Sequence, residues 1–172
     1  YVQKMNKLSI CIPVFNGEEF IKDTVDSLIL QAEKNKVSLV IIDDNSTDNS
    51  FKILSRYHED HSIISLIKND STIGMDKNFS KVINFAKTEY VWFFGQDDIL
   101  LDGAIEKLLN VINDNSSPDL IYFNYKQMNH NMDETICSSY LNTQLLSNKK
   151  INGDKLFNGK EEYFKYLESL PT

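Results

Sequence analysis

The sequence has few of the residues that define several common protein classes. It contains only 2 cysteines in 172 residues, Cys11 and Cys137, so it has no disulfide framework and no metal-binding cysteine spacing. Cys11 lies within an apolar run and is expected to be a small core residue. A charged-then-apolar signal segment is missing, and no apolar run reaches the roughly 20 residues that span a bilayer. We therefore expect a protein of the cytoplasm.

Positive charge and glycine-rich phosphate loops are also scarce. Lysine and arginine number 18 against 25 aspartates and glutamates, and the formal net charge is −7. This balance excludes a broad nucleic-acid-binding face, which needs basic residues. It does not exclude a small phosphorylated ligand, because a metal ion can supply positive charge locally. The absence of G-x-G-x-x-G after the first apolar run argues against a dinucleotide-dependent oxidoreductase.

Short apolar runs alternate with longer amphipathic segments. This alternation predicts right-handed βαβ units and an α/β/α sandwich with a mostly parallel sheet. Residues 126–150 are expected to form a hairpin or an ordered loop, and residues 160–170 a last helix. The expected strands are 8–14, 37–42, 63–67, 90–94 and 119–125. The first expected helix covers residues 18–31 and the last covers residues 105–112. A second, capped by Ser46 or Thr47, would turn Phe51, Leu54 and Tyr57 inward. A third would turn Phe79, Val82, Ile83 and Ala86 inward.

Polar groups follow the predicted strands directly, where an open α/β sheet binds its ligands. Two of the strand ends carry adjacent carboxylates, and a carboxylate at the end of a buried strand needs a donor, a cation or a metal as partner. The strand ends are Pro13–Asn16, Asp43–Ser46, Asn69–Gly74 and Gly95–Asp98.

Each acidic pair supports a functional and a structural interpretation. Asp97 and Asp98 suit a hard cation, since Mg²⁺ typically takes one or two carboxylates together with substrate phosphates. A carboxylate in the Asp43-Asp44 pair suits a nucleobase, whose ring N–H or amino group it would accept. The alternatives are turn or cap chemistry at Asp43–Asp48 and a helix N-terminus at Asp97-Asp98.

The order and spacing of four blocks resemble glycosyltransferase family 2. They are Ser9-Ile-Cys-Ile-Pro-Val-Phe-Asn16, Val40-Ile-Ile-Asp-Asp-Asn-Ser-Thr-Asp48, Gly74 with Asn78, and Glu89-Tyr-Val-Trp-Phe-Phe-Gly-Gln-Asp-Asp98. The similarity runs from about Leu8 to about Tyr125. Within the family, the stretch from Gly74 to Leu100 most resembles bacterial enzymes of surface-polysaccharide and O-antigen assembly.

The resemblance implies a GT-A fold, a nucleotide-diphosphate sugar as donor, Mn²⁺ or Mg²⁺ as metal, and inversion at the anomeric carbon. Asp98 would be the main metal ligand of a DXD-like motif, and Asp97 would approach the ribose or the metal shell. Asp44 would contact the nucleobase and Asp43 would support its loop. The remaining donor contacts would come from Pro13, Val14 and Phe15 in the base pocket, and from Asn78 and Lys77 near the donor.

Two positions depart from the family pattern. Gly95 stands where many members carry an aspartate, and Thr72 where an asparagine is common. The catalytic base stays unassigned, and we expect it beyond Thr172. Residues 1–125 would form the nucleotide-sugar-binding part, and residues 126–172 the start of an acceptor-side region of the same domain that is truncated here. The downstream acids are Asp119, Asp133, Glu134, Asp154, Glu161, Glu162 and Glu168.

Two other classes compete with an active transferase. A GT-A-like module that binds a nucleotide or a partner without transfer agrees with the unassigned base and with Gly95. A phosphoacceptor signalling domain would carry its acidic pair after the first strand, whereas here the pairs follow the second and fourth. For a transferase, the expected partners are the sugar donor and a saccharide or lipid-linked acceptor, with peripheral membrane association through residues outside this chain.

Overall fold

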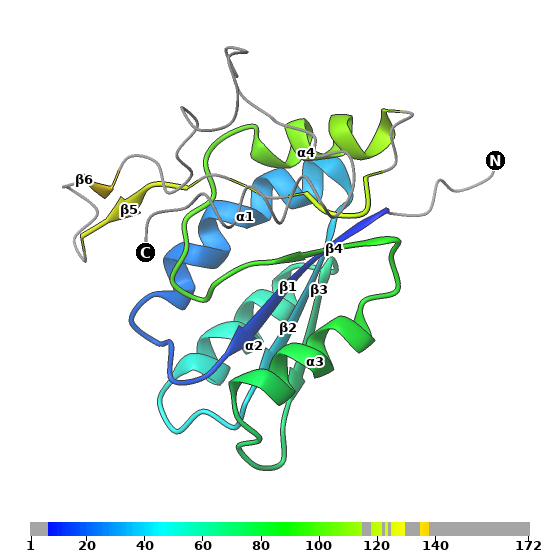
Figure 1. The fold of residues 1–172 in the computed structure, drawn as a ribbon. Helices are drawn as coiled ribbons and strands as arrows, with labels where there is room; N and C mark the ends of the chain where they lie inside the picture. The colour runs from blue at the N-terminus through cyan, green and yellow to red at the C-terminus, as the bar shows by residue number, and fades with distance from the viewer. Residues whose placement is uncertain (1–6, 115–117, 122, 124, 130–134, 138–172) are drawn as a thin grey trace. The chain divides into compact units, whose positions relative to one another are not determined.

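The computed structural model describes residues 7–114, 118–121, 123, 125–129 and 135–137. The chain divides into two units, one ending at Ser117 and the other beginning at Pro118. The first unit holds a four-stranded sheet and four helices (Figure 1). Its strands are β1 (Leu8–Val14), β2 (Ser38–Asp43), β3 (Ile64–Lys68) and β4 (Tyr90–Phe93). Its helices are α1 (Ile21–Asn35), α2 (Ser50–Asp60), α3 (Met75–Phe85) and α4 (Ala104–Asn113).

The sheet is fully parallel, as the alternating pattern predicts, with strand order β3-β2-β1-β4. The chain first moves outward from β1 through β2 to β3, and then returns to place β4 on the other side of β1. Right-handed connections therefore put α1 and α2 on one face and α3 on the opposite face. The direction of winding reverses between β1 and β4, and such a switch point is where open α/β sheets bind ligands.

The core consists of the central strands and the apolar stripes of the helices. Ile10, Ile12, Leu39 and Ile41 are completely buried, as expected for strands covered on both faces. On the α3 face, Cys11 packs with Val40, Ile42 and Val82. Burial raises the pKa of the Cys11 thiol to about 12, so this cysteine is a core residue as predicted.

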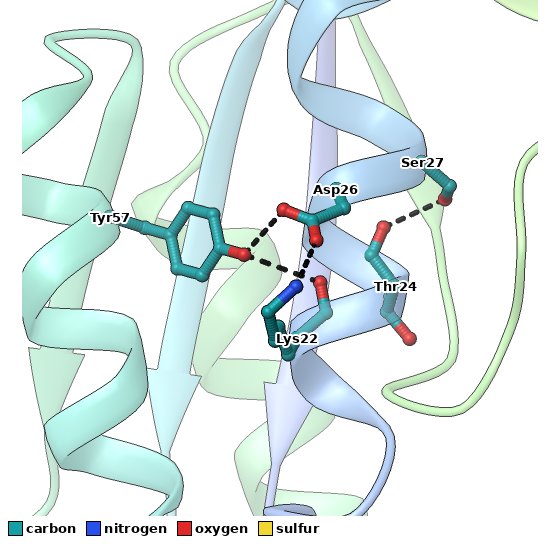
Figure 2. A network of polar contacts seen from close by, with 5 residues as sticks. All are labelled: Lys22, Thr24, Asp26, Ser27 and Tyr57. Atoms are coloured by element: carbon teal, nitrogen blue, oxygen red, sulfur yellow. Dashed lines mark hydrogen bonds and ion pairs between the residues drawn. The ribbon is translucent and has the colours of Figure 1, made fainter.

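Helices α1 and α2 are joined by an exposed polar network that lies between them (Figure 2). The Tyr57 hydroxyl on α2 donates to the Asp26 carboxylate on α1, and Lys22 Nζ lies 2.6 Å from the other Asp26 oxygen. These bonds hold the pKa of Asp26 below its ordinary value. The network fixes α2 against α1, and both helices begin beside the loops that follow β1 and β2.

Two helix starts differ from the sequence prediction. Helix α1 begins at Ile21 rather than residue 18, because the Gly17 carbonyl accepts the Phe20 and Ile21 N–H groups in a preceding turn. Helix α2 is not capped by Ser46 or Thr47. It begins at Ser50, and its first N–H groups are satisfied by Asp48 and by the more distant Glu18.

The second unit contains an antiparallel pair in its described residues, β5 (Gln127–Met128) and β6 (Thr135–Cys137), in agreement with the predicted hairpin or loop. The predicted strand at 119–125 is wrong, since its described residues carry no strand. Its β-forming composition describes a fit to a pleated surface and does not by itself supply a pairing partner. The predicted helix at 160–170 lies outside the described residues. Within the described part, no helix has the length and apolarity needed to cross a bilayer.

Candidate functional site

Four loops meet at the carboxyl edge of the sheet, one after each strand. Because all four strands are parallel, the segments that begin after Val14, Asp43, Lys68 and Phe93 share this edge. These are the strand ends that the sequence singles out. The loop after β1 occupies the centre, between the loop after β2 on one side and the loop after β4 on the other.

The loop after β2 places its two carboxylates in different environments. Asp43 is fully buried, and its Oδ1 accepts the Ser46 N–H at 3.0 Å in a tight turn. Asn45, within this turn, adopts φ 60°, a left-handed conformation that asparagine tolerates better than most residues. Asp43 Oδ2 is buried without a hydrogen-bond partner in the described part of the chain. This geometry agrees with a loop-supporting role for Asp43.

Asp44 holds the loop that follows β3. Its Oδ1 accepts the Ile73 N–H at 2.9 Å and the Asn69 amide at 2.7 Å, while its Oδ2 accepts the Gly74 N–H at 2.9 Å. Burial opposes ionisation of Asp44, but these donors outweigh it and hold the pKa below the ordinary aspartate value. A carboxylate offers about four acceptor positions, so one position stays available for a nucleobase donor. The nucleobase contact itself stays a prediction.

Asn78 lies behind Asp44 and is part of the same network. Its side-chain N–H donates to the Ile42 carbonyl at 3.0 Å, and its Oδ1 lies 3.2 Å from the Asn69 amide nitrogen. Lys81 Nζ contacts Asn69 Oδ1 at 2.6 Å and so places a positive charge near Asp44. Asn78 is only 2% exposed, and this network gives it a supporting position. Lys77, predicted near the donor, is exposed.

Asn69 opens one of the four predicted strand-end loops, but the sequence assigned no role to it or to Lys81. The available signal for Asn69 was its position directly after an apolar strand, the same criterion that identifies Asp43 and Asp44. Lys81 gave no local signal, because its contact with Asn69 depends on how α3 packs beside the loop.

The loop after β4 brings the Asp97 and Asp98 carboxylates together over Gly95. A Cβ added to Gly95 would lie 2.6 Å from Asp98 Oδ2 and 3.0 Å from Asp97 Oδ1. The Gly95 N–H donates to Asp98 Oδ2 at 3.1 Å. The Asp98 residue stays accessible, yet partial burial of its carboxyl group raises its pKa, and the neighbouring Asp97 charge adds to this effect. The glycine that departs from the family pattern is therefore the surface on which these carboxylates pack.

These two carboxylates suit a divalent cation that is shared with a ligand. No lysine, arginine or histidine of the described segments forms an ion pair with either one. Within the same segments, no group of three histidine, cysteine or acidic side chains could enclose a metal ion. Magnesium-type sites commonly combine one or two carboxylates with substrate phosphates. The donor set therefore fits a metal site completed by a diphosphate and does not fit an all-protein metal cage.

The end of β1 and the loop after it contain the three residues predicted for the base pocket. Val14 is buried in the strand and Pro13 is half-buried, whereas the Phe15 ring is 45% exposed. The next residue, Asn16, has φ 49°, and its Oδ1 accepts the Thr47 N–H at 2.9 Å. Of these three residues, Phe15 is the most exposed, and its loop is tied to the loop after β2.

A hollow of about 640 Å³ lies beside these loops but includes none of the predicted site residues. It is acidic, yet Glu18 and Asp48 in its wall already accept N–H groups of the chain. Its lining is Asn16, Glu18, Glu19, Phe20, Asp48, Asn49 and Ile53. The carboxylates over Gly95 therefore lie outside the residues that line this hollow.

Comparison with known sequences connects this geometry to one enzyme family. Residues 9–161 match the family described as Glycosyl transferase family 2. Poly(ribitol-phosphate) beta-glucosyltransferase of Bacillus spizizenii is 34% identical, over 64% of this chain and 18% of the relative. Poly(ribitol-phosphate) beta-N-acetylglucosaminyltransferase TarP of Staphylococcus aureus is 34% identical, over 70% and 37%. Abequosyltransferase RfbV of Salmonella typhimurium is 28% identical, over 57% and 30%. The chain spans well under two thirds of each relative.

Solved structures confirm the predicted GT-A fold. Staphylococcus aureus TarS superimposes with a TM-score of 0.57 and 25% identity, over 62% of this chain and 19% of TarS. A shorter TarS in complex with UDP-GlcNAc has the same TM-score and identity, with 31% of that chain covered. A mannosyltransferase of Pyrobaculum calidifontis, solved with GDP-Man and Mn²⁺, has a TM-score of 0.57 at 18% identity, over 63% and 33%, and shows likeness of fold alone.

Proposed function

The chain belongs to glycosyltransferase family 2, and from this premise we propose that it is the donor-binding part of an inverting, metal-dependent glycosyltransferase. The proposed reaction moves a sugar from a nucleotide diphosphate to a hydroxyl group during synthesis of a bacterial cell-surface polysaccharide. The relatives that act on poly(ribitol-phosphate) and the abequosyltransferase support this class of acceptor. The TarS complex with UDP-GlcNAc supports a nucleotide sugar as donor.

One observation carries the proposal. Two carboxylates converge over Gly95 at the sheet's switch point, without a cationic partner among the described residues. On the other side of β1, the buried Asp44 retains acceptor capacity. A nucleotide diphosphate carries a hydrogen-bonding base at one end and phosphates at the other, so its two ends match these two groups.

The proposed residue roles follow from the geometry of each loop. Asp44 accepts a donor of the nucleobase, and the exposed ring of Phe15 packs beside that base, next to Pro13 and Val14. Asp43 and Asn78 support the loop that carries Asp44, through hydrogen bonds to Ser46 and to the Ile42 carbonyl. Asp98 binds the metal, and Asp97 approaches the ribose or the metal shell.

Metal chemistry fits this donor set. When bound, a divalent cation neutralises charge on the diphosphate leaving group and acts as a Lewis acid. The chain's own residues hold the donor in line for attack, which lowers the entropic part of the barrier. A carboxylate base would take the proton of the acceptor hydroxyl, and this base stays unassigned. Of the downstream acids, Asp119 is exposed in the second unit, and Asp133, Glu134, Asp154, Glu161, Glu162 and Glu168 lie outside the described residues.

Isothermal titration calorimetry with UDP, CDP, GDP and dTDP tests the donor site directly. Each nucleotide is titrated with Mn²⁺ and again with EDTA. We expect one of them to bind with a requirement for metal, and Asp98→Asn to weaken that binding by about tenfold or more, as expected when a charge-assisted contact is lost. The asparagine keeps the shape of the side chain and removes its charge.

Asp102→Asn is the matched control, because Asp102 is an exposed carboxylate a few residues further along the same loop. It should bind nucleotide like the wild-type protein. Absence of binding to all four nucleotides by a folded wild-type chain would count against the donor site. An equal loss in the Asp98 and Asp102 variants would indicate that general negative charge matters, rather than a metal ligand.

A non-catalytic module that binds a nucleotide or a partner is the second candidate. The observation that favours it is Gly95, which replaces an acidic side chain of the resembling enzymes and leaves two carboxylates at the site. The full gene product distinguishes the two functions. Metal-dependent nucleotide binding together with sugar transfer to a saccharide or lipid-linked acceptor supports the enzyme, whereas the same binding without turnover supports the module.

The proposal places the protein in the cytoplasm, at the inner face of the membrane when the acceptor is lipid-linked. Residues outside this chain would provide any membrane contact. Flotation of the full gene product with anionic and neutral vesicles tests this placement. Binding to anionic vesicles is the expected result for a peripheral protein.

A further inference from the structure

The Gln96 side chain forms a bridge between the loop after β1 and the loop after β4. Its Oε1 accepts the Phe15 N–H at 2.9 Å, and its Nε2 donates to the Phe15 carbonyl at 3.3 Å. A side-chain amide carries one donor group and one acceptor, so it can pair with both polar groups of a single backbone residue. The two partners are 81 positions apart in the sequence.

The bridge lies where the ordinary strand pairing stops. The last β1–β4 hydrogen bond runs from the Phe94 N–H to the Cys11 carbonyl at 3.0 Å. Backbone groups of alternate residues in a strand face the same side, so Pro13 and Phe15 present theirs toward β4 as Cys11 does. Pro13 has no N–H to donate, and the ladder is interrupted there. The Gln96 amide restores a connection two residues later, at Phe15.

The backbone around Gln96 is itself fixed against α1. The Thr24 hydroxyl donates to the Gln96 carbonyl at 2.7 Å, and the Ser27 hydroxyl accepts the Leu100 N–H at 3.0 Å. Thr24 and Ser27 lie one turn apart on the same side of α1, where Figure 2 shows both. These two hydrogen bonds hold the main chain of the loop from Gln96 to Leu100 against α1.

Gly17 accommodates the bridge. A Cβ at this position would lie 2.7 Å from Gln96 Oε1 and 2.9 Å from its Cδ. Such distances are essentially never seen for real Cβ atoms, so any side chain at residue 17 would displace the amide. The glycine of the predicted Asn16-Gly17 turn is therefore needed for space beside Gln96.

We propose that Gln96 is a positioning residue that sets the spacing between the nucleobase loop (residues 13–17) and the metal loop (residues 95–98). The inference rests on the proposed function, because only a ligand that contacts both loops makes their spacing matter. Gln96 precedes Asp97 directly, so movement of Gln96 transmits to the carboxylates. In this proposal Gln96 acts through Phe15, to which its amide is hydrogen-bonded, and through the adjacent Asp97.

The first test needs no nucleotide. Amide hydrogen exchange compares Phe15 in the wild-type chain and in Gln96→Ala. Loss of the acceptor should make the Phe15 amide exchange at least about tenfold faster, while core amides such as that of Ile41 keep their protection. An unchanged exchange rate at Phe15 would overturn the bridge, whatever ligand the site binds.

The second test measures the effect on the ligand. In the proposed arrangement a free nucleobase contacts Asp44 and the nucleobase loop only, whereas the nucleoside diphosphate with Mn²⁺ also reaches the metal loop. We expect Gln96→Ala to weaken binding of the Mn²⁺-loaded diphosphate by about tenfold, the loss that two hydrogen bonds of ordinary strength can support, and to change the affinity for the free nucleobase by less than about threefold. Equal losses for both ligands, or no loss for either, would contradict a spacing role.

Gly17→Ala provides a matched perturbation from the opposite side. Its Cβ should displace the Gln96 amide and weaken diphosphate binding in the wild-type background, but have almost no further effect in Gln96→Ala. Additive losses would overturn the proposal. If the wild-type chain binds no nucleotide at all, the donor-site function fails, and the exchange experiment alone decides whether the bridge exists.

Discussion

Replacing Gly95 by alanine should separate metal binding from stability. The new Cβ would lie 2.6 Å from Asp98 Oδ2, and ordinary van der Waals contact begins at 3.4 Å. The Asp98 carboxylate therefore has to move outward and lose its bond to the Gly95 N–H. The Gly95 φ lies outside the left-handed range that side chains rarely adopt, so alanine introduces no backbone strain.

The effect on folding should be small. The displaced atoms are the end of an accessible side chain, and replacing glycine by alanine at a compatible φ stabilises by about 0.4–1 kcal/mol through the unfolded state. Loss of one hydrogen bond costs about 1 kcal/mol. These terms nearly cancel, so the free energy of unfolding should change by less than about 1 kcal/mol. Metal-dependent nucleotide binding should nevertheless weaken by about tenfold, because the two carboxylates no longer converge.

Gly103→Ala is the contrasting control. Gly103 has φ 77°, and no atom lies within 4 Å of its added Cβ. Alanine in this conformation costs about 1–2 kcal/mol but leaves the carboxylates untouched. Urea denaturation and calorimetry on both variants give the comparison. The reasoning is refuted if Gly95→Ala destabilises as much as Gly103→Ala, or if it binds metal and nucleotide like the wild-type chain.

Two further predictions concern buried and crowded carboxylates. Asp44→Asn should lower the free energy of unfolding at pH 7 by about 2 kcal/mol, because charge-assisted acceptors of buried N–H groups are lost, while exposed Asp70→Asn should change it little. The pKa of Asp44 is depressed in the folded state. Its contribution to the free energy of unfolding is therefore complete above the ordinary value of about 3.9 and is lost as the pH falls through the folded pKa. Urea titrations across that pH range should accordingly show a weaker pH dependence of the free energy of unfolding for the variant. Asp98→Asn should instead stabilise the metal-free chain slightly at pH 7, by less than about 1 kcal/mol, because the raised folded pKa means that the ionised form is disfavoured on folding. That gain should disappear below the ordinary aspartate pKa, where the carboxyl group is protonated in both states, and a gain that persists there would contradict its electrostatic origin.

The sheet and the four loop positions were predictable because each depends on a local signal. Apolar runs of strand length end in polar segments that begin at Asp43, at Asn69 and, after Gly95, at Gln96, and parallel pairing brings these ends to one edge. That the Asp97 and Asp98 carboxylates lie at the same strand end could be predicted simply because the two residues are adjacent in the sequence. Family resemblance then supplied the ligand, which no spacing alone specifies.

What the sequence did not reveal depends on contacts between distant segments. The N-cap residue of α2, Asn49, donates its N–H to Glu18, 31 positions earlier, and a local search for a capping residue cannot find this contact. The three hydrogen bonds that Asp44 accepts from the loop after β3 likewise require the packing of β2 against β3. The predicted strand at 119–125 failed for the complementary reason, since strand-forming composition has no effect without a neighbour to pair with.

The position of β4 has a consequence for how the protein is made. Strands β1, β2 and β3 pair with their neighbours in sequence, but β4 must return to β1 across about 80 residues, as its pairing of Leu8 with Tyr90 shows. Closing so long a loop is entropically expensive and slow compared with local pairing. During synthesis on the ribosome, the first three strands can associate before residues 90–98 have emerged. The proposed metal loop is then assembled late in the life of the nascent chain, when β4 pairs with β1.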